Sequence, residues 1–382
     1  MVLLGIMSSL GMQPQILCLH IKSHDPILLQ GGITTNGKYF KEVMRLTPTR
    51  FWINNVTRRQ AELAIAEGAV GATQNPAYLS KVLDSEDDGA YLKEMAFPLI
   101  EQYESIDDVI AELQRQAIAG ICKRFERLFD QTGGRLGLVS IQANPFAENT
   151  TTILDNAEKS LSLARNFIIK IPATKDGLAA IGQLIANKVP VLATEVMSID
   201  QILDILKARD ENIRGLKDPA PLWIAHINGI FDEQMSEDVK RAGTDIEKDV
   251  LRQASLLLAR KFRSVMREYA SDAQYMAGGA RTLEHFTDWV GVDGAVTINW
   301  KGTADKLIER DGPVTDVFNA PSSYLAIDKL IEKLPGFAKA WIPGSMKVEE
   351  YEYFSPVVRF RNSFEKGWIS ARTTIESWRV NL

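Results

Sequence analysis

The feature that most constrains the fold of this chain is a regular alternation of short apolar runs and longer amphipathic stretches between residues 50 and 310. The apolar runs occupy residues 50–55, 69–76, 134–145, 166–172, 189–198, 221–230, 273–280 and 294–300. Near-continuous apolar runs are typical of parallel strands that are buried on both faces and connected by helices. Eight such units predict an α/β fold, the (β/α)8 or TIM barrel. A doubly wound sheet would need a glycine-rich phosphate loop after its first strand, and WINNVTRR is not one.

The segments that flank this alternation differ from it in character. Residues 1–48 are predicted to be an N-terminal extension, residues 49–310 the barrel, and residues 311–382 a helical C-terminal extension. The C-terminal extension contains FNAPSSYLAIDKLIEKL, which favours a turn followed by a helix, and its last part is rich in Trp, Tyr and Phe. We interpret it as helices that pack on the barrel or form a subunit contact, which makes a homo-oligomer one of the expected assemblies.

Composition excludes several classes of partner. The 382 residues are 45% hydrophobic and 24% charged, with a net charge of −5 and no basic stripe, so nucleic acid is not expected as a partner. Two cysteines, and four histidines without ligand-type spacing, predict no metal site, and we expect no cofactor. The apolar N-terminus lacks a positively charged start, which favours a cytoplasmic protein over a secreted one. No other apolar run reaches the length of about 18 residues that a membrane span needs.

Lys170 is the most informative single residue. It follows the apolar residues Phe167–Ile169 and precedes a turn at Pro172, with a helix expected after Thr174. A lysine at the carboxyl end of a buried strand projects its amine above the sheet, where desolvation lowers the pKa of the amine toward neutrality. Such an amine can attack a carbonyl group and form a Schiff base. The alternative is a lysine that buries only its methylene groups and extends its ammonium into water.

The chemistry of a barrel of this kind lies at the carboxyl ends of its strands. The polar residues at the predicted ends are Asn54, Asn55, Thr73, Gln74, Asn75, Gln142, Asn144, Lys170, Thr194, Glu195, His226, Asn228, Arg281 and Asn299. One amine is thus accompanied by amides and hydroxyls, with one or two candidate acids or bases. This set contains neither a metal-type cluster nor a Ser-His-Asp arrangement, and it suits a polyhydroxylated carbonyl substrate.

The order and spacing of several segments resemble the transaldolase family, which includes the smaller fructose 6-phosphate aldolases. The matching segments are FWINN, GAVGATQNP, GLVSIQANP, NFIIKIPAT, VPVLATEVMS, PLWIAHINGI, MAGGARTLEHF and AVTINW. The pair formed by TxNP and KIPAT is the most specific of them. The resemblance implies a metal-independent class I aldolase, in which a lysine on the fourth strand forms a Schiff base with a ketose and the C3–C4 bond is cleaved. In transaldolases the retained three-carbon unit then passes to an aldehyde.

The resemblance also implies roles for individual residues. Lys170 matches the Schiff-base lysine, and Asn75 matches the substrate-contacting asparagine of the TxNP motif. Thr194 matches the threonine that helps to hold the catalytic water. Arg281 matches an arginine of the pocket for the substrate's phosphate group.

Other positions depart from the family pattern. Asn54 stands where the family has an aspartate, Gln142 where transaldolases have a glutamate, and Ile230 where the phosphate pocket has a second arginine. The aldolase branch of the family also has glutamine at the position of Gln142. Amides cannot relay protons at pH 7. Glu195 and His226 lie beside the altered positions, so each is a candidate either for a catalytic or substrate-binding role or for a structural one.

Two kinds of function follow from this set. The first is an enzyme in which Lys170 is the nucleophile, Gln142 and Thr194 position water, and Asn54 and Asn75 hold hydroxyl groups of a sugar or modified sugar. Glu195 is the candidate acid or base of this enzyme, and His226 and Arg281 are candidate substrate contacts. The second is a carbohydrate-binding barrel that has lost the proton relay. A different Schiff-base reaction, such as a dehydration or a C–C condensation, also stays open.

Overall fold

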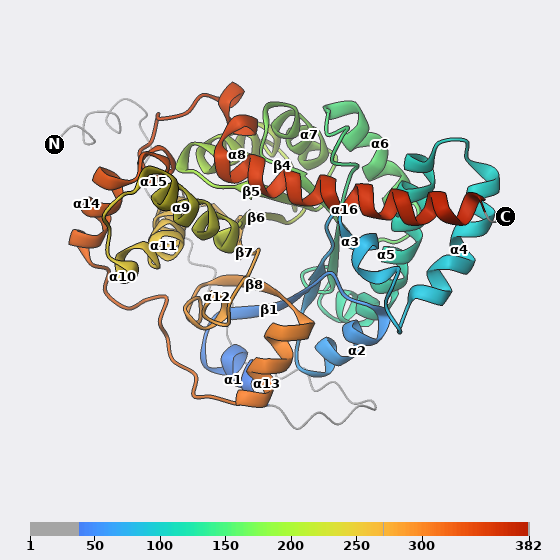
Figure 1. Cartoon of the computed structure of the whole chain (residues 1–382), viewed down its shortest axis with the longest axis horizontal. Helices are drawn as coiled ribbons and strands as arrows, with labels where there is room; N and C mark the ends of the chain where they lie inside the picture. The colour runs from blue at the N-terminus through green and yellow to red at the C-terminus, as the bar shows by residue number, and fades with distance from the viewer. Residues whose placement is uncertain (1–37, 270, 381–382) are drawn as a thin grey trace. The chain divides into compact units, whose positions relative to one another are not determined.

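The computed structural model describes residues 38–269 and 271–380. Most of the predicted N-terminal extension, together with Cys18, His20 and His24, lies outside the described residues. Eight parallel strands form a closed barrel in the order of the sequence (Figure 1). The strands are β1 Thr49–Asn54, β2 Gly71–Thr73, β3 Leu138–Gln142, β4 Phe167–Pro172, β5 Val191–Val196, β6 Leu222–His226, β7 Gln274–Ala277 and β8 Gly294–Asn299. The predicted (β/α)8 barrel is therefore confirmed, and a helical C-terminal extension follows it.

Helices connect the strands and surround the barrel (Figure 1). Up to the last strand they are α1 Tyr39–Leu46, α2 Arg58–Ala66, α3 Tyr78–Val82, α4 Gly89–Gln102, α5 Ile106–Gln131, α6 Thr150–Leu161, α7 Lys175–Ala186, α8 Ile199–Asn212, α9 Asn228–Ala242, α10 Lys248–Leu251, α11 Ala254–Glu268 and α12 Glu284–Thr287. After it come α13 Asp305–Arg310, α14 Tyr324–Lys333, α15 Pro335–Trp341 and α16 Ser355–Val380. No helix in the described ranges has both the length and the hydropathy that a membrane crossing needs.

Polar residues at the helix starts explain where several helices begin. The side chains of Thr57, Thr174 and Ser198 each accept a hydrogen bond from the backbone N–H three residues later. The side chain of Gln60 in turn accepts a hydrogen bond from the backbone N–H of Thr57, which completes a capping box. These contacts satisfy amide groups that have no partner within the helix, so they fix each helix start directly after a strand end.

Some predicted elements were too long. The sixth strand ends at His226, and α9 begins at Asn228, because the Asn228 side chain accepts a hydrogen bond (2.9 Å) from the backbone N–H of Gly229 and turns the chain there. The long amphipathic stretch that follows is divided among α9, α10 and α11. Gly243 ends α9 in a left-handed conformation (φ 62°), which glycine adopts without a steric penalty. The fourth strand, by contrast, ends at Pro172, within the run predicted for it.

The register of the strands gathers the polar residues at one rim of the barrel. Lys170 on β4 lies beside Gln142 on β3 and Leu192 on β5. Asn54 on β1 lies beside Thr73 on β2 and Asn299 on β8. Adjacent residues in register lie close enough for their side chains to interact when both point into the barrel.

Below this rim, aromatic residues fill the interior of the barrel. The side chain of Trp52 lies two residues before Asn54 on the same face of β1, and its ring centroid is 5.3 Å from that of Trp223 on β6. Both residues are buried. The barrel is therefore packed at its amino-terminal end and open to chemistry only at its carboxyl end.

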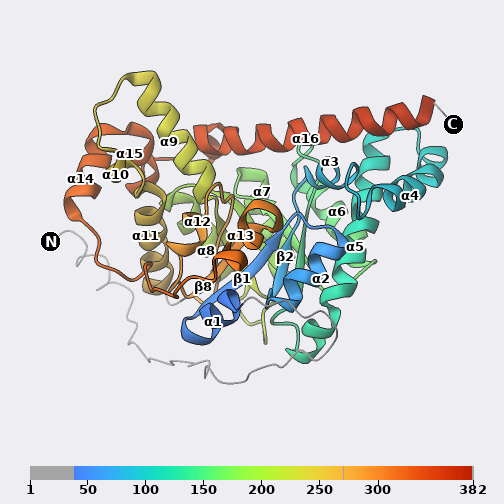
Figure 2. The ribbon, with the colours of Figure 1, turned by 60° about the horizontal axis from the view of Figure 1, so that its bottom comes forward.

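The helix α16 extends across the carboxyl-end side of the barrel, where α3 also lies (Figure 2). Asp107 in α5 anchors it, because its carboxylate accepts hydrogen bonds from Trp368 Nε1 (2.8 Å) and from Arg372 Nη2 (2.7 Å). Near its end, Arg379 Nη1 donates to the carbonyl of Glu104 at 2.8 Å. These contacts hold a helix of the C-terminal extension next to the strand ends.

Candidate active site

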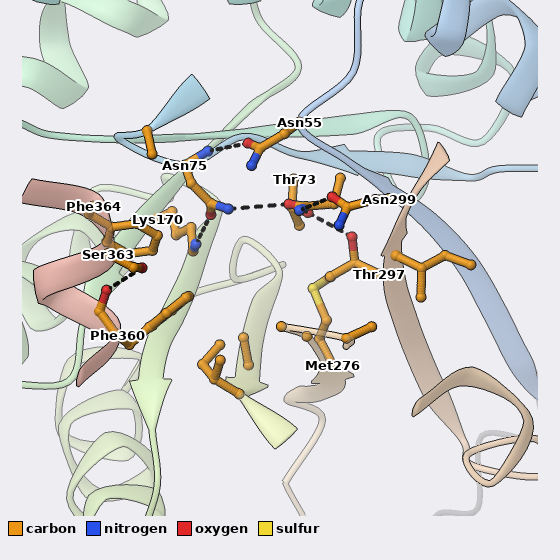
Figure 3. Close-up of a pocket in the computed structure, with 18 of the residues that line it drawn as sticks. Asn55, Thr73, Asn75, Lys170, Met276, Thr297, Asn299, Phe360, Ser363 and Phe364 are labelled. Carbon is orange, nitrogen blue, oxygen red and sulfur yellow. Dashed lines mark hydrogen bonds between the residues drawn. The ribbon is translucent and has the colours of Figure 1, made fainter. Parts of the chain in front are cut away.

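A cavity of ≈ 180 Å³ lies at the carboxyl ends of the strands (Figure 3). Its polar wall comes from β1, β2, β8 and the loop after β2, with the side chains of Asn54, Asn55, Thr73, Asn75, Thr297 and Asn299. Its apolar wall comes from β5, β6, β7 and α16, with the side chains of Leu192, Ala225, Ile227, Met276, Phe360 and Phe364. The cavity therefore offers hydrogen-bonding groups on one side and apolar surface on the other.

Lys170 extends its amine into this cavity between the two walls (Figure 3). Its Nζ donates a hydrogen bond to Oδ1 of Asn75. The rings of Phe364 and Phe360 lie with their centroids 5.2 and 5.7 Å from Nζ. Burial lowers the pKa of Lys170 to about 8, although the nearby carboxylates of Glu195 and Glu148 act in the opposite direction.

A network of amides and hydroxyls positions Asn75. Oδ1 of Asn54 accepts hydrogen bonds from Thr73 Oγ1 (2.9 Å) and from Asn75 Nδ2 (3.3 Å), and Asn54 Nδ2 donates to Asn299 Oδ1 at 2.8 Å. The backbone N–H of Asn75 donates to Oδ1 of Asn55 at 3.0 Å. The Asn75 amide is thus fixed with its oxygen toward the Lys170 amine, as Figure 3 shows.

Two carboxyl groups, those of Glu148 and Glu195, lie near Lys170, although neither residue lines the cavity. Gln142 Nε2 donates hydrogen bonds to Glu148 Oε1 at 2.7 Å and to Glu195 Oε1 at 3.3 Å. Burial, together with the neighbouring Glu195, raises the pKa of Glu148 well above its usual value. Burial also raises the pKa of Glu195, to about 7, while Lys170 partly counteracts it. Two carboxyls that share one amide group do not both ionise readily, so the pair holds a proton near neutral pH.

The backbone of β5 explains why Glu195 reaches this position. Regular alternation would point its side chain away from Thr194 and Leu192, toward the helices. The register with β6 shifts between Ala193 and Val196, and Glu195 has φ 60°, a conformation that is uncommon outside glycine. Gln201 Nε2 stabilises the irregular strand by donating to the backbone carbonyl of Glu195 at 3.0 Å. The bulge brings the carboxyl group to Gln142.

Three buried polar atoms next to this pair have no hydrogen-bond partner within the described residues. They are Oε1 of Gln142, Oγ1 of Thr194 and Oε2 of Glu195. Buried polar atoms are normally paired, so unpaired ones beside a pocket indicate contacts with a small molecule or water. The resemblance implied that Thr194 helps to hold a water molecule, and this role stays a prediction.

His226 occupies a different environment from the one predicted. On β6 the side chain of Ala225 lines the cavity, so alternation directs His226 outward to the helix layer. There its ring lies against Phe262, with centroids 4.9 Å apart, and its Nδ1 is 3.3 Å from the hydroxyl of Tyr275. Burial lowers the pKa of His226 to about 3. The predicted contact of His226 with substrate is therefore corrected: it is a packed residue outside the cavity.

Arg281 lines the outer edge of the cavity, as predicted for a binding residue, but it is already paired. Its Nε donates to Glu233 Oε1 at 2.8 Å, and its Nη1 donates to the carbonyl of Gly279 at 3.2 Å. The cation predicted to meet an anionic substrate group thus carries a carboxylate partner from α9.

The sequence did not single out Glu148, Phe360 or Phe364. Glu148 is the only acidic residue in the loop between β3 and α6, ANPFAEN, and a search for acids after each strand would have found it. Phe360 and Phe364 are one turn apart on α16, far along the chain from the barrel strands. No local pattern connects them with Lys170.

The structure thus defines a class: a closed (β/α)8 barrel with a buried lysine amine, of lowered pKa, on its fourth strand. Comparison with known families agrees with this class. The family described as Transaldolase/Fructose-6-phosphate aldolase matches residues 51–340, and the chain belongs to this family.

Curated relatives carry the same family name. Transaldolase 1 of Streptomyces avermitilis is 25% identical over 228 residues, which cover 55% of this chain and 58% of the relative. Transaldolase 1 of Streptomyces coelicolor is 24% identical over 250 residues, with 60% and 64% covered. The transaldolase of Saccharopolyspora erythraea is 28% identical over 222 residues, with 53% and 59% covered. The chain thus matches less than two thirds of the length of these relatives.

Proposed function

We propose that this protein is a transaldolase-like class I aldolase or transferase, in which Lys170 forms a Schiff base with a ketose or modified sugar. The observation that carries the proposal is the buried Lys170 amine, whose pKa is lowered to about 8 between a fixed amide and a pair of carboxyls. An amine with a pKa near neutrality is a nucleophile at physiological pH. Family membership supports the same type of reaction.

The reaction begins when the neutral Lys170 amine adds to the ketone carbon. The resulting carbinolamine loses water and becomes an iminium ion. A base then removes the proton of the C4 hydroxyl, the C3–C4 bond breaks, and its electron pair moves into the iminium as an enamine. The aldehyde leaves. The enamine either attacks the carbon of an aldehyde acceptor, which forms a new C–C bond, or takes a proton on carbon. Both routes give an iminium again, and water hydrolyses it to the ketone product and the free Lys170 amine.

Glu195 and Glu148 supply the proton transfers that this sequence needs. Since the pair holds one proton near pH 7, one carboxyl can donate a proton to the leaving water while the other accepts a proton from a hydroxyl group. Gln142 orients both groups through its Nε2. Thr194 and the free Oε1 of Gln142 offer polar contacts for the water that is released and later consumed.

The polar wall of the cavity binds the sugar. Asn54, Asn75 and Asn299 present amides whose mutual hydrogen bonds fix their orientation, so they lose little entropy when hydroxyl groups bind. Arg281 at the outer edge contacts the far end of the substrate. The cytoplasmic location and the homo-oligomer expected from the sequence belong to the same proposal and are tested by fractionation and by light scattering.

Borohydride trapping tests the proposed function. The protein is incubated with a panel of ketoses and reduced, and intact mass and peptide mapping then locate the adduct. We expect one stable adduct on Lys170, which Lys170→Ala abolishes and Lys175→Ala retains. Lys175 is the matched control, since it begins the helix after the same strand and is exposed at the surface.

Failure to trap any carbonyl compound would refute the Schiff base. Binding of a sugar without an adduct would support the alternative, a carbohydrate-binding barrel. Product analysis of a trapped reaction distinguishes C–C cleavage from dehydration.

A further inference from the structure

The outer edge of the cavity contains an ion-pair network that joins three distant parts of the chain. Glu233 on α9 pairs through Oε1 with Arg281 Nε at 2.8 Å, and through Oε2 with Arg359 Nε on α16 at 3.5 Å. These side chains are half-exposed. Arg281 lines both the cavity and an outer groove beside it, whereas Glu233 and Arg359 line only the groove.

This network occupies two of the three nitrogens of the Arg281 guanidinium. Its Nε is bound to Glu233, and its Nη1 lies 3.2 Å from the carbonyl of Gly279 and 3.4 Å from that of Ala280. The carboxylate of Glu233 also offsets part of the positive charge of the guanidinium, since Glu233 is shared between Arg281 and Arg359. A phosphate dianion would have to displace this carboxylate before it could bind the guanidinium through Nε and Nη2 together, the bidentate arrangement that makes phosphate binding tight.

The neighbouring residues do not replace the lost charge. Ile227 lines the cavity, and Ile230 is buried next to it on the first turn of α9. Lys81 also lines the cavity from α3, and it has no hydrogen bond or ion pair with any of the described residues. Lys81 is exposed, and both the surrounding protein and Arg281 lower the pKa of its amine. One exposed ammonium matches a single charge or a hydroxyl group better than a dianion.

The opposite wall of the cavity has the same preference for uncharged groups. Asn54, Asn299 and Thr297 are neutral and can both donate and accept hydrogen bonds, which is the pattern that hydroxyl groups satisfy. Within the described residues that line the cavity, the cations other than the reacting Lys170 are Lys81 and Arg281. Charge and hydrogen-bonding capacity thus both favour a polyol end over a phosphate ester.

We propose that Glu233 determines the substrate class of this site: by pairing with Arg281 it selects an unphosphorylated ketose and disfavours a phosphate ester. The proposal rests on the proposed Schiff-base function. Glu233 acts through Arg281 and does not touch the reacting carbon, so it is a specificity-determining residue.

Trapping with two matched ketoses tests the proposal. The rate of borohydride-trapped adduct is measured with fructose and with fructose 6-phosphate, in the full chain and in Glu233→Gln. The ratio of the two rates is compared between proteins, because this comparison cancels the different open-chain fractions of the two sugars. We expect Glu233→Gln to shift the ratio toward fructose 6-phosphate by about tenfold, the size of one charge-assisted contact.

Two further variants show whether the shift depends on Arg281. Glu237→Gln removes a carboxylate one turn later on α9, in the same outer groove, that has no ion pair with any described residue, and it is expected to leave the ratio unchanged. Arg281→Met added to Glu233→Gln is expected to remove the gain. Circular dichroism melts check that each variant is folded.

The possible outcomes separate the two proposals. No adduct with either sugar in any protein contradicts the Schiff-base function itself. Adducts that form normally, with a ratio that Glu233→Gln does not change or that Glu237→Gln changes equally, overturn the role of Glu233. Faster trapping of the phosphorylated sugar by Glu233→Gln alone supports it.

Discussion

The two ends of the cavity use charge in different ways. Next to the inner end, Lys170 comes close to Glu195 and Glu148 in a buried environment, which lowers the pKa of the amine and raises the pKa of both carboxyl groups. At the outer end, Arg281 is half-exposed and pairs with Glu233, which also pairs with Arg359. Burial makes the inner charges reactive, because neither protonation state is strongly preferred.

This difference assigns separate tasks to the two ends. A half-exposed ion pair contributes little to stability, so we assign the pair at the outer end to selectivity. A buried carboxyl pair next to an amine is costly to maintain, and it persists where proton transfer uses it. Changes at the inner end should therefore alter rates, and changes at the outer end should alter which substrate reacts.

The largest effect is expected from Glu195→Gln. Removal of this acid should lower turnover about 10²–10³-fold, the usual contribution of a positioned acid or base. The Lys170 adduct should still form, because Glu195 raises the pKa of the amine and its loss leaves more of the amine neutral. Steady-state product formation and borohydride trapping measure the two effects. Glu158→Gln on the exposed face of α6 is the control, and turnover within threefold of the wild type would contradict the role of Glu195.

The pH dependence of trapping distinguishes the buried amine from an exposed one. Only the neutral amine attacks the carbonyl, so with a pKa of about 8 the initial trapping rate should rise roughly 50-fold from pH 6 to pH 8 and level off near pH 9. A lysine in water would show a rate that keeps rising beyond pH 10. A profile of that second kind would mean that Lys170 is solvated, and the contrast between the two ends of the cavity would fail.

Gln142→Glu tests whether the amide has become essential. This substitution places a third carboxyl against Glu148 and Glu195 and removes the Nε2 donor that both accept from. We expect about a tenfold loss of turnover at pH 7.5 and a partial recovery near pH 6, where the new carboxyl is protonated and can donate. Gain of activity at pH 7.5 would show that this position still works as a family carboxylate. Turnover measured at both pH values, with thermal melts, decides between these results.

The smallest effect is expected from Ser363→Ala. Ser363 lines the cavity, but its hydroxyl donates to the carbonyl of Phe360 within α16 at 2.6 Å and is therefore already satisfied. Turnover and the trapping rate should change less than about twofold. A loss of tenfold or more would mean that the hydroxyl leaves the helix to bind substrate, and α16 would then take part in recognition as well as in covering the amine.

Much of the fold could be predicted from the sequence because the barrel is encoded locally. Apolar runs buried on both faces identify the strands, and capping residues such as Thr57 and Thr174 identify where helices begin. The errors have local causes as well. Asn228 turns the chain within an apolar run that looks continuous, and Gly243 ends a helix inside a stretch that remains amphipathic.

The candidate site was predictable only in part. The positions of Lys170, Gln142, Asn54 and Asn75 follow from their place at strand ends, because every parallel strand of a barrel ends at the same rim. Strand alternation correctly directs the side chain of Ala225 into the cavity and that of His226 outward. The predicted contact of His226 with substrate was wrong because β6 stays regular at this point. For Glu195 alternation fails, since a bulge turns the side chain.

By itself, the sequence determined the barrel and the lysine on its fourth strand, and its resemblance to the family indicated two amides at positions where carboxylates are expected. Only the tertiary structure decided what surrounds the lysine. Glu148 approaches it from a loop, and Phe364 approaches it from the C-terminal helix. At the outer edge of the cavity, Glu233 pairs with Arg281, which is 48 residues away in the sequence. The physical reason is range: strand and helix patterns depend on near neighbours in the chain, whereas desolvation and ion pairing depend on groups that only folding brings together.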